Sequence, residues 1–144
     1  MANPASMIRD LLITDAVGVD SVTADWSVFL FQEPETPDAV ITVYNAGGEA
    51  RDPKWGLDFP SIQVRVRGKP GDYTTAYTKI SDVVTALLGR DPETVQGDEI
   101  QAFNMLGDII QLGFDQSNRP LLVVNFRLII EPTLPGGSHR TAIS

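Results

Sequence analysis

Between positions 60 and 88 the apolar residues change their spacing once, from every second residue to a helical repeat. The apolar residues of the first part are Ile62, Val64 and Val66, and the polar residues that alternate with them are Gln63, Arg65 and Arg67. Strict alternation predicts a strand with one buried face. After Gly68–Gly71, apolar residues recur at helical spacing from Tyr73 to Leu88, and Asp72 stands where a carboxylate stabilises a helix N-terminus. The chain must therefore accommodate a half-buried strand followed by an amphipathic helix.

The other periodic segments are shorter and are separated by turn residues. The dipeptide Asn3-Pro4 predicts a first helix over 4–17, ending at Gly18. Branched and aromatic residues predict strands at 26–31, at 39–44, twice within 100–114, and at 121–130. We therefore predict an α+β fold in which two helices pack on a mixed, largely antiparallel sheet, in the order αβββαβββ.

The length of 144 residues corresponds to one domain. We expect residues 1–130 to form it and residues 131–144, which contain Pro132, Pro135 and Gly136-Gly137, to form an extended C-terminal tail. Leu134 and Ile143 give this tail too little apolar surface to offset the entropy of ordering. We expect it to become ordered only against a partner; the alternative is a dispensable end.

Residues that carry chemistry are scarce. The sequence has no cysteine, and its one histidine, His139, lies in the polar tail, so no serine–histidine–aspartate arrangement is supported. The acidic residues of one connection do not have the spacing of a calcium loop; they are Asp91, Glu93, Asp98 and Glu99. We expect no enzyme activity, no catalytic, cofactor-binding or metal-binding residues, and no cofactor. No apolar run has the length of a membrane span, so no membrane partner is expected.

The charge of the chain is acidic and uneven. Eleven basic and 19 acidic residues give a net charge of −8, distributed as −7 in residues 1–50, +3 in residues 51–69 and −4 in residues 70–144. An acidic chain is a poor ligand for nucleic-acid phosphates. The basic segment could instead complement an acidic surface on another copy of the chain. The alternative is that its arginines form a solvated strand face.

Two polar strand faces are the candidate interaction residues. Gln63, Arg65 and Arg67 are successive outward positions of the 60–67 strand, and arginine suits bidentate contacts with carboxylates. Asn125 and Arg127 lie on one face of the 121–130 strand, which predicts that this face is open to solvent or to a partner. We predict that the five residues share one polar surface at a subunit or partner interface, where the arginines pair with carboxylates of a neighbouring subunit.

An ordered set of segments resembles a known family. The segments are Val43-Tyr44-Asn45-Ala46-Gly47-Gly48, Phe59-Pro60-Ser61-Ile62-Gln63-Val64-Arg65-Val66-Arg67-Gly68, the helix from Tyr73 to Leu88, Leu112-Gly113-Phe114-Asp115, and Asn125-Phe126. In this order and at these separations they look like the tail terminator, or minor capsid, proteins of long-tailed bacteriophages, over roughly residues 7–130. The turn Gln116-Ser117-Asn118 departs from the family pattern.

The resemblance implies a structural virion protein. Such a protein would form a hexameric ring that caps the tail tube, ends tube polymerisation and provides the surface for head–tail joining. Its partners would be further copies of the chain, the tail tube protein and the head–tail connector protein, with genomic DNA passing through the lumen without specific binding. It would lie at the tail–neck junction of the virion, and in the host cytoplasm during assembly. The alternative is a neck or head-completion ring protein of the same virus class.

Overall fold

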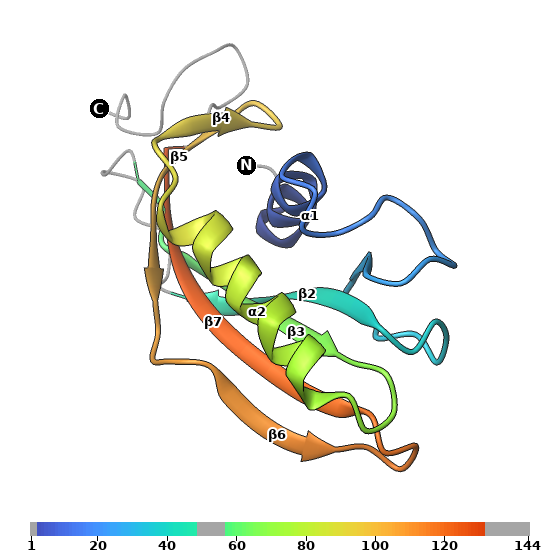
Figure 1. Cartoon of the computed structure of the whole chain (residues 1–144). Helices are drawn as coiled ribbons and strands as arrows, with labels where there is room; N and C mark the ends of the chain where they lie inside the picture. Colours follow the sequence, from blue (N-terminus) through green and yellow to red (C-terminus); the bar gives the residue numbers. More distant parts are fainter. Residues whose placement is uncertain (1–2, 49–56, 132–144) are drawn as a thin grey trace, which may run out of the picture.

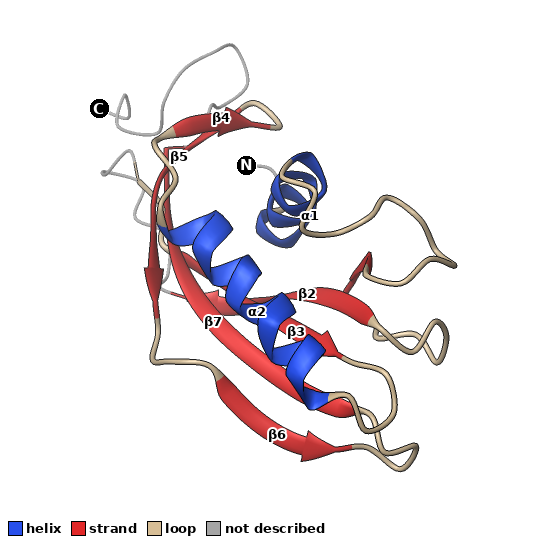
Figure 2. Cartoon of the chain, in the orientation of Figure 1, coloured by secondary structure: helices blue, strands red, loops and turns tan. Residues whose placement is uncertain are grey.

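The computed structural model describes residues 3–48 and 57–131. Within them, two helices lie against one seven-stranded sheet (Figures 1 and 2). The elements in chain order are α1 (Pro4–Thr14), β1 (Ser27–Leu30), β2 (Val40–Gly48), β3 (Pro60–Arg67), α2 (Tyr73–Leu88), β4 (Glu93–Val95), β5 (Asp98–Met105), β6 (Ile110–Phe114) and β7 (Pro120–Glu131). The structure is mostly sheet, and the sheet curls like half of a barrel (Figure 1).

The long strand β7 organises the sheet. One edge of β7 pairs with β3. The other edge pairs with β6 over the N-terminal part of β7 and with β5 over the C-terminal part of β7. The order across the described sheet is β1-β2-β3-β7-β5-β4, with β6 beside β7, and the β1–β2 pair is parallel while the other pairs are antiparallel. Register shifts follow Ile100 in β5 and Gln111 in β6. Such bulges bend a strand and increase its twist, which contributes to the curl of the sheet.

The predicted fold class is wrong in its element order and in its balance of helix and sheet. The described elements follow the order αβββαββββ, and the sheet dominates. The strand missing from the predicted order is β4. It lies in the stretch that was expected to be an acidic connection. β4 has three residues, of which only Val95 is buried. Its sequence therefore contains no alternating pattern that would predict a strand. Its hairpin turns at Gln96 and Gly97, both at positive φ, without the Asn-Gly signal of such turns.

Both helices begin at the side chains that the sequence indicates. Asn3 caps α1 by accepting a hydrogen bond from the backbone N–H of Ala5 at 3.1 Å, and Oδ1 of Asn45 at the far end of β2 accepts from the same N–H at 3.0 Å. Asp72 caps α2 by accepting from the backbone N–H of Thr75 at 3.2 Å. These contacts satisfy N–H groups that a helix leaves unpaired in its first turn. α1 ends at Thr14, one turn earlier than predicted.

One apolar core lies between the helices and one face of the sheet. The helices contribute Ala5, Met7, Ile8, Leu11, Leu12, Ala76, Ile80, Val83 and Leu87, and the three central strands contribute Ile41, Val43, Ile62, Val64, Val66, Leu122, Val124, Phe126, Leu128 and Ile130. Because side chains alternate along a strand, the residues between these positions point to the opposite face. Neither described helix is long and apolar enough to cross a membrane. The predicted tail lies outside the described residues except for Glu131.

Candidate interaction surface

The pairing of β3 with β7 brings the polar residues of both strands to the face of the sheet that neither described helix covers (Figure 1). Gln63 lies opposite Asn125, and Ser61 lies opposite Arg127. Residues directly opposite in an antiparallel pair have their side chains on the same face. Nε2 of Gln63 donates a hydrogen bond to Oδ1 of Asn125 at 3.2 Å. The two polar faces therefore belong to one surface, and contact of this surface with another subunit stays a prediction.

The two arginines of β3 differ in exposure and share an acidic partner within the chain. The Arg65 side chain is 32% exposed; its Nη1 lies 3.3 Å from Oε2 of Glu33, and its guanidinium lies over the ring of Tyr44. The Arg67 side chain is only 4% exposed, and its Nη1 lies 3.2 Å from Oε1 of the same Glu33. In this structure the carboxylate that both arginines contact thus comes from their own chain, and Arg67 lies beneath the surface rather than on it.

Arg67 and Arg119 together hold the connection between β1 and β2. Arg67 donates to the backbone oxygens of Pro37 at 2.8 Å and Asp38 at 2.9 Å. Arg119, also buried, donates from Nη1 to the backbone oxygen of Glu35 at 2.7 Å. Parallel neighbouring strands usually need a crossover of about a dozen residues or more. The 31–39 connection is shorter, and the two arginines supply donors for backbone carbonyls that no helix or strand satisfies.

Arg119 also fixes the turn that leads into β7. Its Nε donates to Oδ2 of Asp115 at 2.8 Å, and its backbone N–H donates to Oδ1 of the same residue at 2.9 Å. Removal from water acts to raise the pKa of Asp115, but the hydrogen bonds from Arg119 and its positive charge lower that pKa below its ordinary value. The role of Arg119 could not be predicted from the sequence, because its partners Glu35 and Asp38 are about 80 positions away and no local pattern connects them.

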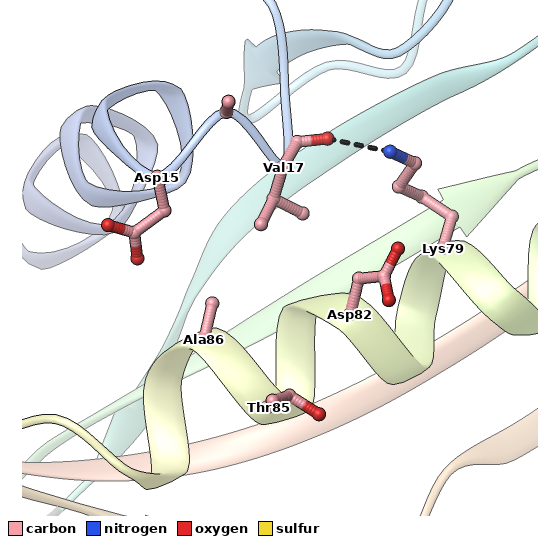
Figure 3. Close-up of a pocket in the computed structure, with 7 residues that line it drawn as sticks. Asp15, Val17, Lys79, Asp82, Thr85 and Ala86 are labelled. Atoms are coloured by element: carbon pink, nitrogen blue, oxygen red, sulfur yellow. Dashed lines mark hydrogen bonds between the residues drawn. The ribbon is translucent and has the colours of Figure 1, made fainter.

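An open groove of about 510 Å³ lies between the segment after α1 and one side of α2 (Figure 3). It is lined by Asp15, Ala16, Val17, Lys79, Asp82, Thr85 and Ala86. Nζ of Lys79 donates to the backbone oxygen of Val17 at 2.9 Å and lies over the ring of Trp26. The lysine is therefore engaged in holding α2 to the chain that precedes β1.

The acidic connection of the sequence analysis is part of the β4–β5 hairpin. Glu93 pairs with Arg90, which also pairs with Asp15 at the end of α1. Asp98 is buried at the start of β5. Among residues 3–48 and 57–131, no group of three or more histidine, cysteine, aspartate or glutamate residues is placed to hold a metal ion. His139 lies outside the described residues.

Within the described residues, the sheet buries one face under the two helices and presents polar side chains on the other face. A family model described as bacteriophage tail terminator protein matches residues 11–132, and the chain belongs to this family. No curated protein matches the sequence. The family resemblance seen in the sequence is thus confirmed.

Family membership establishes the general role of the chain. The protein is a structural component of a bacteriophage tail, and its family is not one of enzymes. A tail terminator acts through contacts with other tail or head proteins.

Proposed function

We propose that this chain assembles into a hexameric ring that caps the tail tube, ends the addition of tube subunits and offers the joining surface for the connector of the head. The observation that carries the proposal is the family match over residues 11–132, which covers both helices in whole or in part and all of the strands. We further propose that the ring lies at the tail–neck junction of the virion and assembles in the host cytoplasm.

The distribution of charge supports a ring through which DNA passes. Each described basic side chain has a partner within the chain, among them Arg9 with Asp20 and Lys69 with Asp25. The net charge of the chain is acidic, and six copies at −8 each carry −48. A lumen of the same sign as DNA repels phosphates, which favours passage without specific binding.

The polar sheet face is the contact surface that we propose for a protein partner. Gln63, Arg65, Asn125 and Arg127 lie on the face that neither described helix covers, and each is partly exposed. Amides and guanidinium groups in one patch offer both donors and acceptors to a polar partner. Arg67 contributes indirectly, because it holds Glu33 beside Arg65. We assign this surface to the contact with the tube or with the connector.

The experiment that tests the proposal measures tube length. Purified tail tube protein is allowed to polymerise with increasing amounts of the full-length chain, and electron microscopy gives the length distribution. We expect shorter tubes that carry a cap at one end as the ratio rises. In lysates of the phage that encodes the chain, its removal should give overlong tails without heads. Tubes whose length does not depend on the chain would overturn the proposal, and binding to heads alone would favour the neck protein.

A further inference from the structure

The exposed large apolar side chains gather at two edges of the sheet. Within the described residues, four lie in β6 or just before it and three lie beside β1; they are Leu106, Ile110, Leu112 and Phe114, and Val19, Val22 and Phe31. The two others, Tyr77 and Leu88, lie on α2. Singly exposed apolar residues need no explanation, but a concentration at sheet edges does.

The edge formed by β6 is open and carries no charge. β6 pairs with β7 on one side, and no described strand pairs with its other side (Figure 1). Its sequence, Ile110-Gln111-Leu112-Gly113-Phe114, contains neither lysine nor proline, the residues that usually protect an edge strand from pairing with another chain. Ile110, Leu112 and Phe114 are each between 46% and 48% exposed. A strand edge of this kind is a site for addition of another chain.

The edge at β1 is apolar and differs from the β6 edge. Val19 forms a bridge with Ser27 on the side of β1 that faces away from β2, and is 43% exposed. Val22, in the same connection, is 70% exposed, and Phe31, directly after β1, is 47% exposed. At the level of the N-terminal half of β7 the sheet runs β1-β2-β3-β7-β6. The two apolar edges therefore lie at opposite ends of one sheet.

We propose that the β6 edge of one copy of this chain docks against the β1 edge of the next copy. Two unlike surfaces at opposite ends of a subunit give a head-to-tail contact, and such a contact closes into a ring when the rotation between copies permits. Each edge gathers three or more exposed large apolar side chains, and clusters of this kind mark interaction sites on monomers. The inference rests on the proposed ring and names the surfaces that build it.

Introduced thiols test this contact directly, because the natural chain has no cysteine. The full-length double variant Phe31→Cys with Leu112→Cys is treated with a short bis-maleimide cross-linker at high protein concentration. We expect a ladder of covalent oligomers on a denaturing gel. The matched control is Phe31→Cys with Leu88→Cys, since Leu88 is 44% exposed and Leu112 is 47% exposed. This control should give at least tenfold less oligomer.

Mixing of single variants tests that the contact is head-to-tail. The single variants Phe31→Cys and Leu112→Cys should each remain monomeric after cross-linking, and their mixture should give a dimer and nothing larger. The proposal is overturned if the double variant gives no more oligomer than its control. It is also overturned if Leu112→Cys alone gives as much dimer as the mixture, because the contact would then be symmetric. A ladder together with unchanged tube length would reject the tube cap and retain the edge contact.

Discussion

Nη1 of Arg67 lies 3.2 Å from Oε1 of Glu33, and the two side chains expose only 4% and 14% of their surface. The other carboxylate oxygen of Glu33 contacts Arg65 at 3.3 Å. Because Glu33 belongs to the connection between β1 and β2, this contact ties that connection to β3. It also positions Arg65 at the polar face of the sheet. A buried residue thus controls the geometry of the surface above it.

Removal of the Arg67 side chain should therefore lower the free energy of unfolding more than removal of the Arg65 side chain. Arg67→Ala leaves one oxygen of the mostly buried Glu33 carboxylate and the backbone oxygens of Pro37 and Asp38 without their donor, so we expect a loss of about 3–5 kcal/mol in the free energy of unfolding. Arg65→Ala should cost about 1 kcal/mol or less, because that side chain is 32% exposed. Urea denaturation of both variants and the wild type measures the difference. Equal losses would contradict the division between a buried and a surface arginine.

The contact between Asp115 and Arg119 predicts a dependence of stability on pH. The folded state lowers the pKa of Asp115 from its ordinary value of 3.8. A carboxyl group whose pKa is lower when folded contributes stability above its ordinary pKa, and that stability is lost as the pH falls through the folded value. We expect Asp115→Asn to be less stable than the wild type at pH 7 and to approach it below the ordinary value. Denaturation at several pH values provides the measurement. A constant difference between the two proteins would contradict the prediction.

The local elements of this fold could be predicted from the sequence, and the long-range contacts could not. The alternation of Ile62, Val64 and Val66 placed β3, and the Asp72 cap placed the start of α2. β4 could not be predicted, because three residues with one buried side chain are too few to show a periodic pattern. The partner of Arg67 was predicted on another subunit, because nothing in the local sequence indicates that the connection before β2 folds back beside β3. Such a contact depends on sheet order, which periodicity does not encode.

The two adjacent glycines at the end of β2 should respond differently to substitution. Gly47 and Gly48 both have positive φ, 83° and 108°, so alanine is strained at either position. An added Cβ at Gly47 meets nothing within 4 Å, whereas at Gly48 it lies 2.4 Å from the backbone oxygen of Phe59. We expect Gly47→Ala to cost about 1 kcal/mol and Gly48→Ala to cost clearly more, because backbone must move. Thermal unfolding of both variants measures which substitution lowers stability more. A larger loss of stability for Gly47→Ala would show that the turn is packed differently.

The amide pair at the centre of the polar face tests its proposed contact with a partner. The double variant Gln63→Ala with Asn125→Ala removes a hydrogen bond of 3.2 Å between two partly exposed side chains, so the free energy of unfolding should fall by only about 0.5–1.5 kcal/mol. Loss of central contact residues costs about 1–2 kcal/mol of binding, so roughly tenfold more protein should be needed to cap tubes.

The matched control for this variant is Thr74→Ala with Thr78→Ala, which changes two exposed polar residues of α2 on the opposite side of the sheet. Electron microscopy gives tube length as a function of protein concentration for the wild type and both variants. We expect the control to cap tubes as the wild type does. If the sheet-face variant also caps at wild-type concentrations, the polar face is not the contact surface, and the partner must bind elsewhere on the ring.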